Sequence, residues 1–413
     1  MYRDMTGGGI TRSLLLFALP MMAGSLLQQL YNVADTLIVG RALGRDALAA
    51  VGSAFTLTTF LTSVFLGLAM GAGALFAICI GRGDMAALRR AAALALCLIG
   101  AVTAVLTALV YALLSPILRF LQVPETLRGD MAGYLRIIFV GLAATFLYNF
   151  FACLLRAAGN SAAPLWFLGG AALLNVGLDL LFVLVCRWGV AGAAAATVTA
   201  QYAAGLGLTV YALRRCRELL PRRTDFRFDR RILRELLDLS LLTCVQQSAM
   251  NFGILLVQRL VDSFGPVVMA AFAAAVKIDA FAYLPVQELG NAFSTFAAQN
   301  YGAGQPERLR QGLRRATAVS AAFSCAVAAL VVLFARPLMG LFVQAGETEV
   351  IAAGVLYLRI EGAFYAGIGC LFLLYGFYRA VQRPGMSVVL TVISLGTRVA
   401  LAYALAGPVG EAG

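Results

Sequence analysis

Apolar runs of about 20 or more residues recur along the whole chain. Each run is long enough to cross a hydrocarbon core of about 30 Å as a helix. Hydrophobic residues make up 61% of the 413 residues and charged residues only 13%, which excludes a soluble globular protein. We therefore expect an all-α integral membrane protein.

The apolar runs predict eleven membrane-spanning helices. The polar segments between them are short and leave little room for a soluble domain. The predicted spans are Ser13 to Val39, Ala47 to Ile78, Ala91 to Leu113, Met131 to Leu155, Pro164 to Val185, Gly189 to Ala212, Leu236 to Val257, Val267 to Ala298, Ala316 to Phe334, Ile351 to Tyr378 and Met386 to Leu405.

Arginines in the short loops predict the orientation of these helices. They are most frequent in the loops that follow even-numbered spans, which places the N-terminus in the cytoplasm. Residues 214–235 carry nine arginines on the same side and are expected to be a basic cytoplasmic linker. Its end, Asp229 to Leu241, is expected to be an interfacial amphipathic helix that leads into the next span. The net charge of +12 then reflects topology and contact with anionic lipid, and we expect no nucleic-acid partner.

The two halves of the chain resemble each other. With a shift of 221 residues, LGRDALAAVGSAF from Leu43 aligns with FGPVVMAAFAAAV from Phe264, and IGRGDMAALRR from Ile80 aligns with YGAGQPERLRQ from Tyr301. Two similar bundles that rock around a site between them are typical of transporters, whereas channels and membrane enzymes need no such duplication.

The repeat predicts two pseudo-symmetric six-helix lobes around a central cavity. Residues 1–213 are expected to form the N-terminal lobe and residues 236–413 the C-terminal lobe. The final residues, GEAG from Gly410, align with GVAG from Gly189 at the start of helix six. The twelfth helix is therefore expected to be missing from this chain, and the alternative is an eleven-helix protein.

Polar side chains inside apolar runs are costly and therefore indicate functional sites. The chain has no histidine, so any proton chemistry depends on carboxylates. Two carboxylates among neutral oxygen ligands suit either the binding of Na⁺ or the carriage of protons. The alternative is a structural hydrogen-bond cluster between helices. The polar residues that share a helix face are Gln28, Tyr31, Asn32 and Asp35; Asn175 and Asp179; and Thr197 and Gln201.

The second half lacks this set of residues. The positions equivalent to Asp35, Asn175 and Asp179 are occupied by Leu256, Arg398 and Ala402, so ion coupling is expected in the first half only. Lys277 and Asp279 stand at i, i+2 and so on different faces, where each needs its own partner, in a structural salt bridge or in transport. Glu288 and Glu361 remain without an assigned role. The polar residues that could line the cavity are Gln246, Gln247, Asn251, Lys277 and Asp279.

Three segments carry a resemblance to a known family. They are QQLYNVADTLIVGRALGRDALAA from Gln28, LRAAGNSAAPLWFLGGAALLNVGLDLLFV from Leu155 followed by GVAGAAAATVTAQ, and STFAAQNYGAGQPERLRQGLRR from Ser294. In these segments the chain resembles the multidrug and toxic compound extrusion family, and in particular its branch of DNA-damage-inducible F proteins. In the first half, the counterpart of QNYGAG reads CIGRGD and lacks the glutamine.

The resemblance implies two six-helix lobes and export of amphipathic, cationic compounds in exchange for H⁺ or Na⁺. In the branch named above, the coupling site lies on helices one, five and six, and Asp35, Asn175, Asp179 and Thr197 match that pattern. A Na⁺ site is thus expected at these four residues.

We therefore predict a secondary active efflux antiporter that works by alternating access as a monomer in the bacterial cytoplasmic membrane. Its partners would be small amphipathic substrates and the lipid bilayer, with H⁺ or Na⁺ as coupling ion and no other cofactor. The alternative within the same superfamily is a flippase for a lipid-linked precursor. An enzyme is not expected, because the sequence has neither histidine nor a paired aspartate motif of the kind that holds Mg²⁺ and diphosphate.

Overall fold

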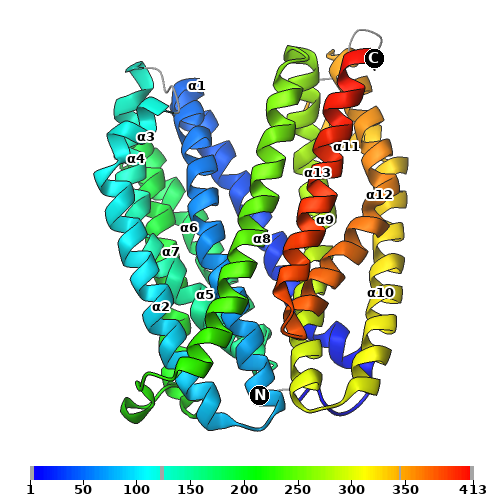
Figure 1. The fold of residues 1–413 in the computed structure, drawn as a ribbon. Helices are drawn as coiled ribbons and strands as arrows, with labels where there is room; N and C mark the ends of the chain where they lie inside the picture. Colours follow the sequence, from blue (N-terminus) through cyan, green and yellow to red (C-terminus); the bar gives the residue numbers. More distant parts are fainter. Residues whose placement is uncertain (1–3, 121–124, 344–345, 410–413) are drawn as a thin grey trace. The chain divides into compact units, whose positions relative to one another are not determined.

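The computed structural model describes residues 4–120, 125–343 and 346–409, and this part of the chain consists of helices without any strand (Figure 1). The prediction of an all-α membrane protein is therefore confirmed. The expectation about GEAG at residues 410–413 lies outside the described residues. The α-helices are α1 (Ile10–Gly81), α2 (Met85–Ala112), α3 (Leu114–Phe120), α4 (Glu125–Val140), α5 (Leu142–Ala157), α6 (Ala162–Asp179), α7 (Gly189–Arg215), α8 (Arg230–Asp262), α9 (Pro266–Gly302), α10 (Pro306–Leu333), α11 (Ala335–Gly340), α12 (Thr348–Ala380) and α13 (Pro384–Val409).

Within the described residues, nine helical segments are long and apolar enough to cross a membrane, and the bent pair α4 and α5 would make ten. These ten correspond to ten of the eleven predicted spans. The remaining predicted span, Gly189 to Ala212, lies in α7. This helix is rich in alanine and glycine rather than in large apolar residues. It is helical, as predicted, and its crossing of the membrane stays a prediction.

Two glycines interrupt the long helices. Gly44 has φ 85° and ψ −172° and divides α1 into the spans Ile10–Gly44 and Leu57–Gly81. A positive φ of this kind is accessible to glycine without steric cost. Gly141 separates α4 from α5, whose axes differ by 40°. The predicted single span from Met131 to Leu155 is therefore a pair of helices, because the chain bends at this glycine.

The expected helix from Asp229 to Leu241, leading into the next span, is continuous with that span, and its interfacial position stays a prediction. Helix α8 begins at Arg230 and continues without a break to Asp262. The Asp229 carboxylate accepts hydrogen bonds from the backbone N–H groups of Arg231 at 3.0 Å and Ile232 at 3.2 Å. These are the bonds of an N-terminal helix cap, and they start the membrane-crossing helix directly after the linker.

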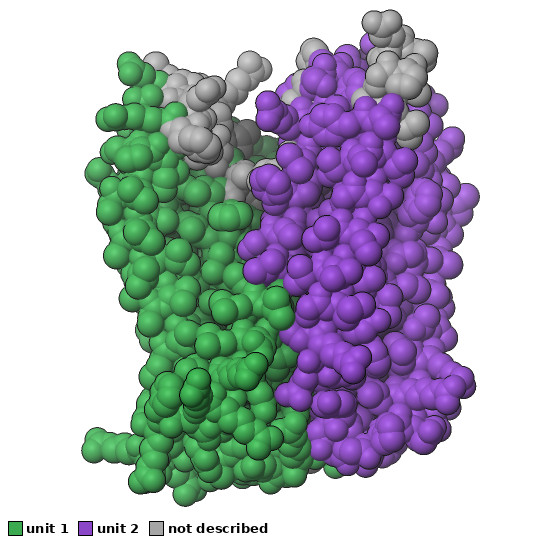
Figure 2. Space-filling view, in the orientation of Figure 1, with its two compact units in different colours: residues 1–4, 26–244 green, residues 5–25, 245–413 purple. Residues whose placement is uncertain are grey.

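The described chain divides into two compact units, shown in Figure 2. Unit 1 contains residues 1–4 and 26–244, and unit 2 contains residues 5–25 and 245–413. The first part of α1 thus belongs to the unit that holds the second half of the sequence, and the first part of α8 belongs to the other unit. The predicted lobe boundaries stay a prediction, but the chain changes units inside two helices rather than at the linker.

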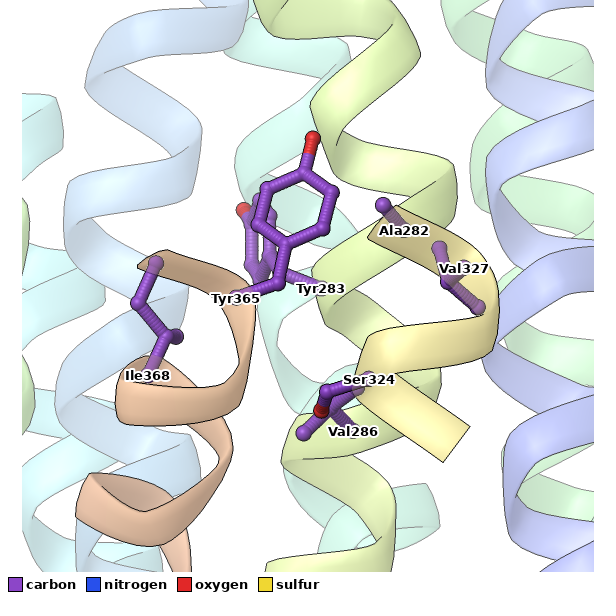
Figure 3. A pocket seen from close by; sticks show the side chains of 7 residues that line it. All are labelled: Ala282, Tyr283, Val286, Ser324, Val327, Tyr365 and Ile368. Carbon is purple, nitrogen blue, oxygen red and sulfur yellow. The ribbon is translucent and has the colours of Figure 1, made fainter. Parts of the chain in front are cut away.

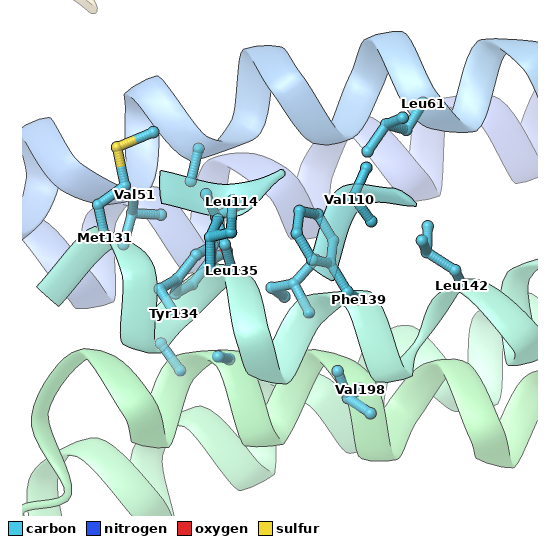
Figure 4. Packing of buried hydrophobic residues seen from close by; sticks show 14 of the residues in the cluster. Val51, Leu61, Val110, Leu114, Met131, Tyr134, Leu135, Phe139, Leu142 and Val198 are labelled. Carbon is cyan, nitrogen blue, oxygen red and sulfur yellow. The ribbon is translucent and has the colours of Figure 1, made fainter. Parts of the chain in front are cut away.

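Unit 1 is held together by close backbone packing and by an apolar core. Gly67 and Gly71 lie one turn apart on α1 and face residues 239–244 of α8, where the Ser240 hydroxyl donates to the Leu68 carbonyl at 3.1 Å. A Cβ atom at Gly71 would lie 2.5 Å from the Leu239 carbonyl oxygen, so only glycine fits at this position. Small residues spaced by four are a common way for membrane helices to approach closely. The core around Met131, Leu135 and Phe139 is shown in Figure 4.

Unit 2 binds the start of the chain. We call residues 5–9 the N-terminal strap. The Met5 N–H donates to Gln299 Oε1 at 3.0 Å, and Asn300 Nδ2 donates to the Met5 carbonyl at 3.2 Å. Arg308 donates to the carbonyls of Gly7 at 2.7 Å and Gly8 at 2.9 Å, and also to that of Met5. The glutamine of QNYGAG, Gln299, therefore helps to hold the N-terminal strap on unit 2.

Candidate functional site

The predicted polar face of the first span lies on α1 in unit 1. Asp35 is half-buried, and its Oδ1 atom is inaccessible to solvent. Tyr31 lies one turn before it, within hydrogen-bonding reach of the exposed Gln28. Asn32 is half-buried, and its backbone carbonyl accepts a bond of 2.8 Å from the Thr36 hydroxyl. The four predicted residues thus share one side of the helix, and Asp35 is the last of them along the chain.

Helix α6 supplies the second acid. Asn175 is 1% exposed and Asp179, one turn further on, is fully buried. Asp179 is the last residue of α6, and residues Leu180–Val185 continue as a wider π-helical turn, η1. Such turns interrupt an α-helix and occur frequently at functional sites. The chain therefore places its buried carboxylate at a local change of helix type.

The structure brings the two acids together. The carboxyl groups of Asp35 and Asp179 lie within hydrogen-bonding reach of each other. Asp35 Oδ1 and both carboxylate oxygens of Asp179 have no hydrogen-bond donor among the described residues, and both side-chain polar atoms of Asn175 are likewise without a partner. Adjacent buried carboxylates repel unless a proton or a cation lies between them. The available ligand atoms are all oxygens, which fits Na⁺ as well as H⁺.

Two tyrosines, Tyr31 and Tyr134, lie near the pair, and a third, Tyr148, lies near Tyr31. Tyr31 was predicted, whereas Tyr134 on α4 and Tyr148 on α5 were missed. Tyr134 is 7% exposed and lies within electrostatic range of Asp35, Asp179 and Tyr31, and Tyr148 lies within range of Tyr31. Figure 4 shows Tyr134 among the apolar side chains of unit 1. A tyrosine in an apolar run gives no signal of its own, because Tyr is also an ordinary residue of membrane helices.

The α7 residues are not joined to the pair by any described hydrogen bond. Thr197 is half-buried and makes no side-chain bond to either carboxylate in the described part of the chain. Gln201 lies against Gly141 at the bend between α4 and α5, with its Oε1 atom buried and without a partner. Their contribution to an ion site stays a prediction.

The predicted cavity residues of the second half lie in unit 2 in different environments. Gln246 and Gln247 on α8 are buried, and both polar side-chain atoms of Gln246 lack a described partner. Asn251 is half-buried. Lys277 is exposed while Asp279 is buried, so these two residues do lie on different faces of α9.

Asp279 has its partners on α12. The Tyr365 hydroxyl donates to Asp279 Oδ1, and Tyr357 lies within hydrogen-bonding reach of the same carboxylate. Glu361, also on α12, forms a 3.5 Å ion pair with Arg398 of α13. Figure 3 shows the narrow pocket beside this cluster, in which the rings of Tyr365 and Tyr283 lie next to Val286 and Ser324. The sequence did not indicate Tyr365 or Arg398 as partners of these two acids, because both contacts depend on how separate helices pack.

Comparisons with known proteins agree with this architecture. The family model described as MatE matches residues 20–181 and 243–404, one segment in each half of the chain. The chain is 31% identical over 393 residues to the probable multidrug resistance protein YpnP of Bacillus subtilis (strain 168), a match that covers 95% of this chain and 87% of that protein.

Two solved structures share the fold. One is an outward-facing multidrug resistance MATE family transporter of the MOP superfamily, with a TM-score of 0.90 and 24% identity over 96% of this chain and 88% of that one. The other is a MOP superfamily transporter from Pyrococcus furiosus Vc1 (DSM3638), with a TM-score of 0.91 and 23% identity over 97% of this chain and 89% of that one.

Proposed function

This chain belongs to the multidrug and toxic compound extrusion (MATE) family of membrane transporters and is not an enzyme; we propose that it is a secondary active antiporter that exports amphipathic, cationic organic compounds in exchange for H⁺ or Na⁺. The observation that carries this proposal is the pair of the half-buried Asp35 and the buried Asp179, in which Asp35 Oδ1 and both carboxylate oxygens of Asp179 have no donor among the described residues. A structural hydrogen-bond cluster would satisfy its own polar atoms. An ion-coupling site needs ligand atoms that are free when the ion has left.

The pair couples ion binding to a rearrangement of helices. When both carboxylates are charged they repel, and α1 and α6 are held apart at this level. A bound proton or Na⁺ removes the repulsion and favours a different packing of the two helices. Coupling requires only that the ion prefer one of two arrangements, which then alternate access for the substrate.

Helix α1 is the part that we expect to move. Pro20 lies inside this helix and leaves one backbone carbonyl without its usual partner. The chain passes from unit 2 to unit 1 between Ser25 and Leu26, directly after Gly24. A helix that is weakened where it changes units can transmit a change at Asp35 toward the start of the chain.

A flippase for a lipid-linked precursor is the second candidate. Such a substrate carries a pyrophosphate, which needs unpaired basic side chains inside the membrane. In the second half, Arg398 is already paired with Glu361. We prefer the antiporter because the two acids Asp35 and Asp179 lie together in unit 1. We further propose that the protein belongs to the branch of DNA-damage-inducible F proteins, acts as a monomer and lies in the bacterial cytoplasmic membrane with its N-terminus inside.

Efflux from proteoliposomes tests the proposal. A fluorescent lipophilic cation is loaded, and a Na⁺ gradient and a pH gradient are imposed separately on wild type, Asp35→Asn and Asp238→Asn, the last being an exposed acid of α8. We expect efflux driven by one gradient in wild type and in Asp238→Asn, and its loss in Asp35→Asn. Efflux that ignores both gradients in wild type would instead indicate a flippase or a channel.

A further inference from the structure

In the linker between α7 and α8, two acidic side chains face helix α2. It contains two short turns, η2 (Arg217–Leu219) and η3 (Arg223–Asp225), and then residues 226–229 without helix. Asp225 forms an ion pair with Arg89 at 3.4 Å, and Asp229 forms one with Arg90 at 3.3 Å. Both arginines lie in the first turns of α2. Two of the few acids in the linker are thus directed at α2 and paired with its arginines.

The outer side of the same stretch is aromatic. Phe226 and Phe228 lie between Asp225 and Asp229 in the sequence, with Arg227 between them, and they are 51% and 75% exposed. Because the two aspartates are held against α2, the two phenylalanines face away from the protein. Large apolar side chains that point outward beside charged residues are typical of segments that enter the interfacial layer of a membrane.

The outer side is also strongly basic. All nine arginines of residues 214–234 are exposed. Those nearest to the phenylalanines, Arg222, Arg223, Arg227 and Arg230, form no ion pair within the described part of the chain. Their charge is therefore available to an external anion.

The position of the linker places this surface at the edge of the membrane. It contacts the beginning of α2, where the apolar span Met85–Ala112 starts, and it ends at Arg230, where the span Arg230–Val261 starts. Two independent spans thus begin beside it. The basic and aromatic side chains therefore lie next to the starts of both helices.

We propose that residues 222–230 are a binding site for anionic phospholipid headgroups, in which Phe226 and Phe228 enter the interfacial layer and the neighbouring arginines bind lipid phosphates. The surface fits a lipid better than a soluble anion because exposed apolar side chains stand beside exposed basic side chains in the same short segment. Each arginine near an anionic membrane surface contributes roughly a fivefold preference for that surface. This site anchors unit 1 to the bilayer and is independent of the ion-coupling proposal.

The test measures the position of the linker directly. Full-length Phe228→Trp protein is placed in nanodiscs of brominated phosphatidylcholine, with or without about 30% brominated phosphatidylglycerol, a fraction like that of anionic leaflets. The signal of the natural Trp166 and Trp188 is subtracted with the wild-type protein. We expect a blue-shifted emission from the introduced tryptophan and stronger quenching of that emission when phosphatidylglycerol is present.

A matched pair of charge variants separates this site from general electrostatics. Arg223→Gln with Arg227→Gln removes two charges from the linker, and Arg310→Gln with Arg314→Gln removes two exposed charges from α10. In the Phe228→Trp protein, the linker double variant should lose the quenching produced by phosphatidylglycerol and should bind that lipid at least tenfold more weakly. The α10 double variant should retain both properties.

Three outcomes would overturn the proposal. The first is quenching that is the same with and without phosphatidylglycerol. The second is equal loss in the two double variants, which would reflect net charge alone. The third is displacement of the lipid by a few millimolar inorganic phosphate at constant ionic strength, which would identify a site for soluble anions.

Discussion

The change Asp179→Asn should raise the thermal stability of this transporter when no coupling ion is bound. In the wild type, Asp179 is fully buried and faces Asp35 without a donor for either of its oxygens. Two unit charges about 4 Å apart repel by about 4 kcal/mol at an effective dielectric constant of about 20. The asparagine amide removes this repulsion and donates a hydrogen bond to the Asp35 carboxylate, which contributes about 1.5–3 kcal/mol.

A proton shared by the two carboxylates would offset part of the repulsion in the wild type, so the net gain is smaller than the sum of these terms. We expect about 2 kcal/mol, which corresponds to a rise of roughly 4–8 °C in the unfolding midpoint for a unit of about 200 residues. Tryptophan fluorescence of the purified protein in detergent measures this midpoint in Na⁺-free buffer.

The same assay distinguishes ion binding from simple repacking. Added Na⁺ or a lower pH should stabilise the wild type, because the ion or proton binds to the folded pair, and should leave Asp179→Asn unchanged. Asp238→Asn, at an exposed acid of α8, serves as the control and should behave like the wild type. The reasoning is refuted if Asp179→Asn melts below the wild type, or if it keeps the full stabilisation by the ion.

Three further changes test other parts of the structure. Gly71→Leu should lower the unfolding midpoint by at least several degrees, since overpacking against backbone costs about 1–3 kcal/mol or more, while Gly170→Leu, in open space on α6, should not. Arg308→Ala removes the bonds to the N-terminal strap and should speed amide exchange there at least tenfold, measured by mass spectrometry. Tyr365→Phe deprives the buried Asp279 of a donor and should cost about 1–3 kcal/mol of stability in the same melting assay.

Much of the site could be predicted because the spacing of polar residues along a helix determines which of them lie on the same face. Asn175 and Asp179 stand four residues apart, and in the structure both are buried on α6. The unpaired state of the two acids could not be predicted, since it depends on which groups of α1, α4 and α6 meet. Tyr134 was missed for the same reason: its closeness to Asp35 and Asp179 comes from packing between helices.

The breaks in the helices were only partly visible in the sequence. Gly44 falls between two predicted spans, so the division of α1 there was expected. Gly141 falls inside a predicted span, and a glycine in a membrane helix does not by itself indicate a bend. The bend of the chain at Gly141 is a tertiary feature, in which Gln201 of α7 lies against this glycine.

The sequence by itself determined the helical membrane fold, the approximate bounds of the spans and the half of the chain that carries the acids. These properties follow from local hydrophobicity and periodicity, which each segment expresses independently. Tertiary structure alone decided that Asp35 faces Asp179, that Asp279 is held by Tyr365, and that α1 and α8 each begin in one unit and end in the other. The physical reason is that close contacts between distant segments depend on the shapes of both partners, as with Gly71 against Leu239, and no single stretch of sequence contains both.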